Sequence, residues 1–277
     1  MKNKQVIITG PTSGIGKEIA LQLGALGANL VLACRDVARA KQTADEIAQH
    51  TGAQPIAVMQ IDTASQQSIR EFARQYREKY SQLDVLINNA GMNRGMHPRV
   101  KSVDGIELTF ATNVLGYFLL TQELLDLLKA SAPARIVNVA SQFASDLDLD
   151  DLEFERRPFE SAKAYAQSKA CNRLFTWALA RRLKGTQVTA NAMAPGLIAD
   201  TGLYRDAPPE LVARLRQRSG RTIAQGADTA VWLASSPDVE GVSGDFFADR
   251  KKIPCEFKNK TAEEKLWTIC EGLVKAA

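Results

Sequence analysis

The chain has 277 residues, of which 45% are hydrophobic and 24% charged, the proportions of an ordinary globular protein of one or at most two domains. Its net charge of +4 comes from 35 Lys and Arg spread beside 31 Asp and Glu, so we expect no nucleic-acid partner. No run approaches the roughly 18 apolar residues of a membrane span, and residues 6–8 form too short a run for a signal peptide; we therefore expect a cytoplasmic protein with no membrane anchor.

Short apolar runs rich in β-branched residues alternate with longer helical patterns. The runs are apolar throughout, which is typical of strands covered on both faces. Alternation of this kind indicates right-handed βαβ units, so we predict the α/β class: a single-domain, doubly wound parallel sheet with helices on both faces. The predicted strands are 5–9, 29–33, 55–60, 85–88, 135–140 and 187–192, and the predicted helices are 15–26, 37–50, 66–80, 110–130 and 162–183.

The pattern changes after residue 250. Residues 251–254 break it, and Thr-Ala-Glu-Glu at 261–264 resembles a capping box. Apolar residues then recur at helical spacing, so we predict that 251–277 is a tail with an amphipathic helix packed on the domain formed by 1–250. The apolar positions of that helix are 266, 269, 273 and 274.

Metal or disulfide chemistry is not expected. The four cysteines show no CxxC spacing, and only two histidines are present. Free and mostly buried thiols are the predicted state.

A glycine-rich turn at residues 9–16 follows the first strand and opens the first helix. Small residues there let the backbone approach a pyrophosphate, which the free N–H groups of the helix N-terminus then hold. The alternative is a plain turn, because the spacing is G-x-x-x-G-x-G rather than G-x-G-x-x-G. The candidate phosphate-binding residues are Gly10, Thr12, Ser13, Gly14, Ile15 and Gly16.

The end of the second strand favours NADP(H) over NAD(H). NAD enzymes usually place a carboxylate there, whereas this chain has neutral Cys34 followed by Arg35. A guanidinium suits a 2′-phosphate because it forms charge-assisted bonds. We assign Asp36 to the N-cap of the next helix.

Two further strand ends carry candidate cofactor residues. Asp62 could hydrogen-bond the adenine amino group, cap the helix that begins near Ser65, or do both. The sequence 88–91 includes Asn89, Ala90 and Gly91 and would allow the backbone to turn close to the cofactor; a simple strand-ending turn is the alternative.

Tyr165 and Lys169 stand four residues apart in a predicted helix, which puts phenol and ammonium on one face. A nearby cation favours the phenolate, so we expect Lys169 to lower the pKa of Tyr165 toward neutrality. A Tyr and a Lys at this spacing are common on helices. The pair is informative because the other candidate residues occur in the same chain.

Together these residues resemble the short-chain dehydrogenase/reductase family, over about residues 4–250. The resemblance rests on TGPTSGIG at 9–16, NNAG at 88–91, Asn113, Ser141, YAQSK at 165–169 and Pro195-Gly196. It implies a Rossmann fold, with 1–250 as the NADP-binding catalytic domain.

The resemblance implies a role for each matched residue. Tyr165 would be the general acid/base, Lys169 would lower its pKa and contact the nicotinamide ribose, and Ser141 would hold the substrate oxygen. Asn113 would organise a water that leads protons to Lys169, and no metal would be required. The remaining implied cofactor-binding residues are Thr63, Pro195, Gly196 and Thr201, the last with a capping role as the alternative.

Ser141 and Tyr165 are 24 residues apart because of an acidic insertion at 146–157. This spacing is similar to that of the retinol-dehydrogenase-like branch, which implies a lipophilic aldehyde, ketone or alcohol as the small-molecule substrate. The insertion could also be a solvated loop. Substrate specificity is expected in 92–104, 142–160 and 197–222.

Three alternatives stay open. The chain also shares motifs with light-dependent protochlorophyllide reductase, and the same fold could serve a non-catalytic NADP-binding regulator. The resemblance implies helices 110–130 and 162–183 as a homodimer surface, with a monomer as the alternative.

Overall fold

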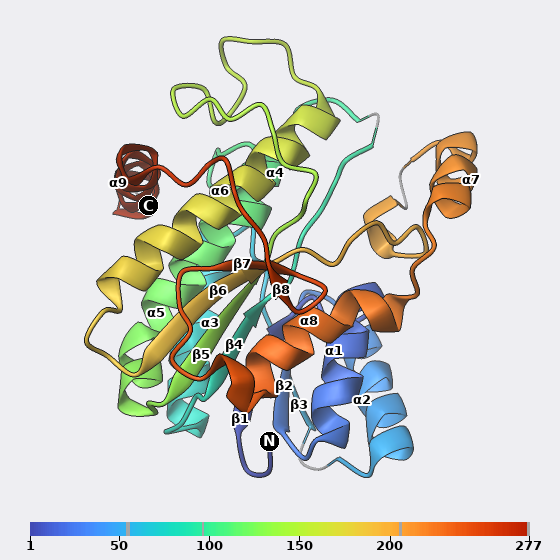
Figure 1. Ribbon diagram of the computed structural model, residues 1–277, viewed down its shortest axis with the longest axis vertical. Coiled ribbons are helices and arrows are strands. Elements are labelled where there is room, and N and C mark those ends of the chain that lie inside the picture. The colour runs from blue at the N-terminus through green and yellow to red at the C-terminus, as the bar shows by residue number, and fades with distance from the viewer. Residues whose placement is uncertain (54–55, 96, 205–206, 276–277) are drawn as a thin grey trace.

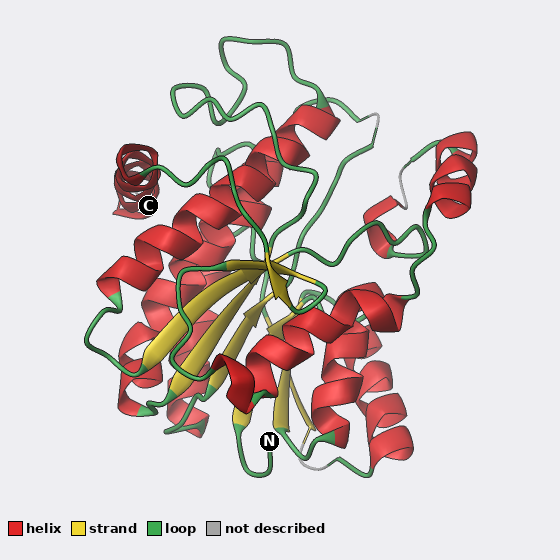
Figure 2. Cartoon of the chain, in the orientation of Figure 1, coloured by secondary structure: helices red, strands yellow, loops and turns green. Residues whose placement is uncertain are grey.

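In the computed structural model one sheet lies between two layers of helices, and residues 1–53, 56–95, 97–204 and 207–275 are described (Figures 1 and 2). The predicted strand 55–60, the loops 92–104 and 197–222 and the tail 251–277 each include positions outside these ranges. Those positions are residues 55, 96, 205, 206, 276 and 277.

The sheet has eight strands in the order β3-β2-β1-β4-β5-β6-β7-β8. The first seven are parallel, and β8 runs antiparallel to β7. Strand order reverses between β1 and β4, which is where a doubly wound sheet opens a crevice for ligands. The bounds are β1 Gln5–Thr9, β2 Asn29–Cys34, β3 Ile56–Gln60, β4 Val85–Asn88, β5 Ala134–Val139, β6 Val188–Met193, β7 Phe246–Ala248 and β8 Lys251–Lys252.

Helices cover both faces, and the predicted α/β fold class is confirmed. Among the described residues, none of the helices combines the length and apolarity needed to cross a membrane. The bounds are α1 Gly14–Ala25, α2 Val37–Thr51, α3 Gln66–Lys79, α4 Leu108–Phe110, α5 Gly116–Ala130, α6 Ser161–Arg182, α7 Pro209–Arg218, α8 Ile223–Ser235 and α9 Lys260–Lys275.

Two apolar clusters fill the space between the sheet and its helices. The smaller lies under α1, α2 and α8, and the larger under α3, α5, α6 and α9. α3 shows how the sequence directs this packing: Ile69, Phe72, Ala73 and Tyr76 stand at positions i, i+3, i+4 and i+7 of one helix face, and all four are buried. The strands carry apolar side chains on both faces, and the helices on each side of the sheet cover these side chains.

α9 lies against the outer side of α6 (Figure 1). Trp267 packs edge-on against Phe118 of α5 at 4.9 Å between ring centroids and stacks on Phe175 of α6 at 6.0 Å. The helix start differs from the predicted capping box, because Asn259 Oδ1 accepts from the Ala262 N–H. Glu264, the residue that would close a box with Thr261, instead pairs with Arg181 and Arg182.

Several elements were not predicted. β7 and β8 have three and two residues, too few for a pattern, and β8 falls within the predicted tail. α7 lies within the loop predicted at 197–222, has no buried residue and stands apart from the body (Figure 1). α8 did carry a readable signal, a capping box formed by Thr222 and Gln225.

Candidate active site

A cleft of about 490 Å³ opens at the carboxyl ends of the strands, at the β1–β4 switch point. It is lined by the glycine-rich turn, by the ends of β2 and β4, and by α6. Buried Thr9 and half-buried Asn89 join the two central strands beneath it. The Thr9 hydroxyl accepts from the Asn89 and Ala90 N–H groups at 2.9 Å, and the Asn89 side chain donates to the Thr9 carbonyl at 2.9 Å.

The turn at 9–16 requires glycine for two separate reasons. Gly10 and Gly14 adopt φ of +66° and +54°, a region that other residues rarely enter. A Cβ on Gly16 would lie 2.3 Å from the Gly10 carbonyl oxygen and 2.4 Å from Asn89 Nδ2. The turn and the first helix therefore touch with no space for a side chain, and the cradle that remains fits a pyrophosphate at the α1 N-terminus.

Cys34, Arg35 and Arg39 line the far end of the cleft. Burial raises the pKa of the Cys34 thiol to about 11, so this position is uncharged at neutral pH. Asp36 caps α2 as predicted, accepting from the Arg39 N–H at 2.9 Å. Arg35 is exposed, and among the described residues it makes no ion pair.

Asp62 lines the same cleft, but it does not cap α3. The cap is Ser65, whose hydroxyl accepts from the Ser68 N–H. Asp62 Oδ1 instead accepts from the Ala64 N–H at 3.0 Å, which holds the turn after β3.

α6 brings Tyr165 and Lys169 to the other end of the cleft, where their side chains are buried. Lys169 Nζ donates to the Val139 carbonyl at 2.8 Å and lies 5.6 Å from the centre of the Tyr165 ring. Burial lowers the pKa of Lys169 to about 7. Burial and then the nearby Tyr204 raise the pKa of Tyr165, partly offset by a hydrogen bond with Ser141. This direction is opposite to the predicted one, because desolvation outweighs any effect of the lysine in the protein alone.

Ser141 follows β5 and reaches Tyr165 without lining the cleft itself. Its hydroxyl also accepts from the Phe143 N–H at 3.0 Å. Phenol and hydroxyl thus meet where a substrate oxygen could contact both. Phe143 is 57% exposed, and its ring stacks at 6.4 Å on that of Tyr165.

Asn113 lies in a π-helical turn, Ala111–Leu115, that interrupts the predicted helix 110–130. Its side-chain amide is fully buried and occupied: Oδ1 accepts from the Met92 N–H at 2.9 Å, and Nδ2 donates to the Met92 carbonyl and to Ser168 Oγ, both at 3.0 Å. Its side chain therefore fixes the loop after β4 against α6. Turns of this kind are frequent at functional sites.

The cleft gathers most of the predicted cofactor residues. Three predicted site residues lie outside its lining: Asn113 and Ser141, and Gly196, whose α-carbon faces the Arg221 side chain. The Thr201 hydroxyl donates to the Ile198 carbonyl at 3.5 Å. The predicted residues in the lining are Gly10, Thr12, Ser13, Gly14, Ile15, Gly16, Arg35, Asp62, Thr63, Asn89, Ala90, Gly91, Tyr165, Lys169, Pro195 and Thr201.

Sequence reasoning missed several lining residues. Ile61, Val139 and Ala140 directly follow or end parallel strands, which was a usable signal. Met92, Asn93 and Leu203 fall within the segments expected to set specificity, but no local pattern singled them out, nor did one single out Thr112 on the π-helical turn. Leu203 lies in a short 3-10 helix, Gly202–Tyr204.

The acidic insertion contains no helix or strand, but part of it is buried and held by hydrogen bonds. Asp151 is buried, and its carboxylate accepts from the Glu155, Arg156 and Arg157 N–H groups. Gln167 Oε1 of α6 accepts from the Asp148 N–H at 3.0 Å, so the insertion is anchored beside α6.

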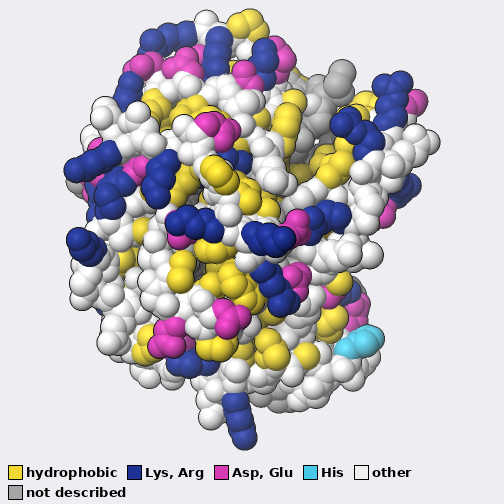
Figure 3. Space-filling model, in the orientation of Figure 1, with side chains coloured by type: hydrophobic (Ala, Val, Ile, Leu, Met, Phe, Trp, Pro, Cys, Tyr) yellow, Lys and Arg dark blue, Asp and Glu magenta, His cyan; other side chains and the backbone are white. Residues whose placement is uncertain are grey.

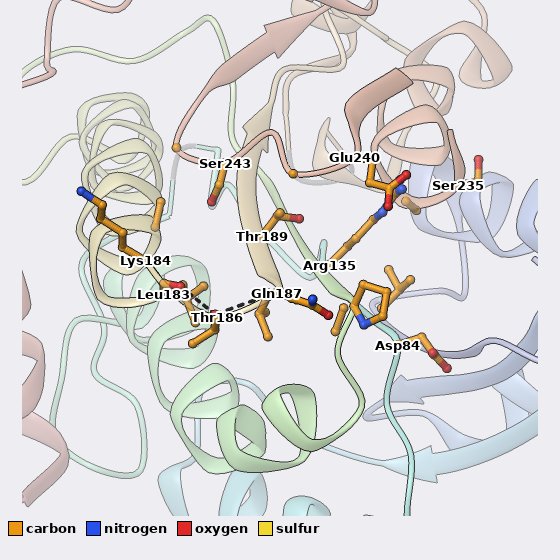
Figure 4. Close-up of a pocket in the computed structure, with 18 of the residues that line it drawn as sticks. Asp84, Arg135, Leu183, Lys184, Thr186, Gln187, Thr189, Ser235, Glu240 and Ser243 are labelled. Carbon is orange, nitrogen blue, oxygen red and sulfur yellow. Dashed lines mark hydrogen bonds between the residues drawn. The ribbon is translucent and has the colours of Figure 1, made fainter. Parts of the chain in front are cut away.

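A larger hollow of about 1010 Å³ lies at the opposite, amino-terminal edge of the strands (Figure 4). Several of its charged groups already have protein partners. Asp84 pairs with Lys4 at 2.8 Å, and Arg135 donates to the Leu233 and Ser236 carbonyls while pointing toward Glu240. This hollow contains none of the predicted site residues, and we assign the chemistry to the carboxyl-end cleft.

Comparison with known proteins identifies relatives of this chain. A family model described as short chain dehydrogenase matches residues 4–211. Retinol dehydrogenase 14 from Mus musculus is 41% identical, over 99% of this chain and 86% of that protein; retinol dehydrogenase 12 from Homo sapiens is 40% identical, over 99% and 87%. The crystal structure of an uncharacterised protein from Mycobacterium paratuberculosis superposes with a TM-score of 0.76 at 30% identity, over 99% of this chain and 94% of that one. The Pseudomonas aeruginosa RhlG/NADP active-site complex gives 0.73 at 26%, over 89% and 94%.

Proposed function

The chain belongs to the short-chain dehydrogenase/reductase family, in its retinol-dehydrogenase-like branch, and from that premise we propose that it is an NADP(H)-dependent enzyme. It would interconvert a lipophilic aldehyde or ketone and the corresponding alcohol, with Tyr165 as general acid/base. One observation carries the proposal: a single cleft has Arg35 at one end and the Tyr165–Lys169 pair, in contact with Ser141, at the other.

The charge at the Arg35 end supports NADP(H). Neutral Cys34 places no negative charge there, and Asp36 is committed to its backbone bond. Arg35 and Arg39 are both exposed and line the cleft, so two cations are available to a 2′-phosphate.

The residues at the other end support carbonyl chemistry. A bound dihydronicotinamide would supply the hydride. Tyr165 would donate its proton to the substrate oxygen as negative charge develops there, and Ser141 would steady that oxygen by a hydrogen bond. A buried phenol with a raised pKa keeps its proton until the substrate oxygen becomes basic, which suits reduction of a carbonyl to an alcohol.

The surroundings of Tyr165 support a lipophilic substrate. Phe143 presents an exposed ring stacked on Tyr165, and Met92 and Leu203 line the cleft nearby. Apolar side chains are visible in the recess between α7 and the body (Figure 3). The relatives named retinol dehydrogenase are consistent with such a substrate.

Replacing Tyr165 tests the chemistry. We expect Tyr165→Phe to reduce kcat at least about 100-fold, the scale of a lost general acid, with NADPH affinity kept. Tyr117→Phe is the matched control, because the buried Tyr117 ring lies 5.7 Å from Lys169 Nζ and its hydroxyl has no hydrogen-bond partner within the described ranges. NADPH oxidation would be followed with retinal and smaller carbonyls. Undiminished kcat in Tyr165→Phe contradicts the assignment.

A second pair of changes tests the cofactor. Cys34→Asp with Arg35→Ala should shift the NADPH/NADH ratio of kcat/KM by about 10- to 100-fold toward NADH, because a charge-assisted contact is removed and a carboxylate added. Lys41→Ala, on α2 and outside the cleft, should leave the ratio unchanged. An unaltered ratio in the double variant would rule out Arg35 as the phosphate-binding residue.

A further inference from the structure

Arg173 is a buried cation for which the proposed chemistry has no use. It follows Lys169 by one turn of α6, so Tyr165, Lys169 and Arg173 lie on successive turns of one helix face. Its side chain is outside the cleft lining, and the residue is only 3% exposed. Among the described residues it forms no ion pair, although a buried guanidinium is costly without a carboxylate.

The guanidinium instead makes two hydrogen bonds. Nη2 donates to the backbone carbonyl of Ser141, and Nη1 donates to Cys255 Sγ at 3.1 Å. The bond to Ser141 is charge-assisted and is made in a buried setting, where such bonds are strong. Nε is buried and has no hydrogen-bond partner in the part of the chain that the structure describes, so these two contacts and packing fix the group.

Two aromatic rings complete the enclosure. The guanidinium carbon lies 4.0 Å from the centre of the Phe246 ring on β7 and 5.5 Å from that of Phe257, beyond β8. Ring faces compensate part of the lost hydration of a cation. Arg173 therefore connects α6 with three other segments: the loop after β5, β7, and residues 253–259.

We propose that Arg173 is a positioning residue for Ser141, an inference that rests on the proposed function. The Ser141 hydroxyl is shared between the Phe143 N–H and Tyr165, and neither contact fixes the peptide that carries it. Arg173 fixes that peptide through its hydrogen bond to the Ser141 carbonyl. Through Cys255 and Phe257, the segment before α9 thus supports a catalytic side chain that it does not touch.

Two variants test this. Arg173→Met keeps the length and apolar packing of the side chain but removes its charge and its hydrogen-bond donors. Arg173→Lys keeps the charge but lacks the two Nη groups that donate to Ser141 and Cys255. Arg182→Met is the matched control. Arg182 lies on the same helix, stacks on Trp267 at 3.8 Å and pairs with Glu264, yet makes no contact with Ser141.

Hydrogen–deuterium exchange of the cofactor-free protein gives a readout independent of turnover. In Arg173→Met we expect the amides of 141–145 to exchange about tenfold faster than in the wild type, the effect of losing one charge-assisted bond. Arg173→Lys should restore part of the protection, and Arg182→Met should leave this segment unchanged. Unaltered exchange at 141–145 in Arg173→Met overturns the proposal.

A double-mutant cycle then tests the link to catalysis. Arg173→Met should lower kcat about tenfold with the NADPH dissociation constant unchanged, but should cause no further loss in a Ser141→Ala background. Equal losses in both backgrounds would mean a general structural role and would overturn the proposal. Faster exchange in a protein that reduces no carbonyl would refute the proposed function while leaving the support of Ser141 intact.

Discussion

Replacing Lys169 by methionine should change how stability depends on pH. Burial lowers the pKa of Lys169 from 10.5 to about 7, which corresponds to about 5 kcal/mol at 1.36 kcal/mol per pH unit. Between these two values the unfolded chain holds a proton that the folded protein has released. The free energy of unfolding of the wild type should therefore rise with pH above 7, relative to Lys169→Met, and fall as the pH drops toward 7.

Urea unfolding of cofactor-free protein at pH 7.0, 8.0, 9.0 and 9.5 measures this difference. We expect it to grow by about 1.4 kcal/mol per pH unit, or about 3 kcal/mol over the range. Loss of the Val139 hydrogen bond adds a constant that does not depend on pH.

Lys163→Met is the matched control on the same helix. Lys163 is exposed and paired with Glu160 at 2.6 Å, which raises its pKa, so it stays protonated in both states across this range. The difference in the free energy of unfolding between Lys163→Met and the wild type should not change with pH. A flat difference for Lys169→Met as well would show that the buried amine keeps its charge, and would refute the argument from burial.

Two other changes have expected outcomes set by packing. Gly16→Ala should weaken NADPH binding at least about tenfold in a fluorescence titration, because the added Cβ would overlap the Gly10 carbonyl and force the turn open. Gly220→Ala is the control and should bind NADPH normally, because a Cβ at Gly220 would meet no described atom within 4 Å. Trp267→Ala should lower the free energy of unfolding by about 3–5 kcal/mol in urea while leaving kcat unchanged, since it removes a core aromatic far from the cleft; a loss below 1 kcal/mol would contradict the packing of α9.

The cleft was predictable because its parts lie at the carboxyl ends of strands. Six short apolar runs could be read directly, and parallel pairing brings the loops after these strands to one edge of the sheet. Cys34, Arg35 and the turn at 9–16 were therefore placed together without knowledge of any tertiary contact. The structure brings them to one cleft with Tyr165 and Lys169.

The features that could not be predicted depend on partners distant in sequence. The π-helical turn at Asn113 is fixed by bonds to Met92 and Ser168, and residues near 113 do not encode those partners. The direction of the Tyr165 pKa depends on burial, which the spacing of Tyr and Lys does not report. Arg173 had no sequence signal at all, because its contacts come from 141, 246 and the tail.

The position of α9 constrains any symmetric assembly. A two-fold axis that stacked α5 and α6 on their copies would require a free outer face on these helices. Trp267 occupies that face against Phe118 and Phe175, and Arg70 of α3 donates to the Val274 carbonyl at 2.6 Å. A homodimer formed on this side would therefore contain α9 from both copies in its interface, and its affinity would depend on the sequence of the tail rather than on that of α6.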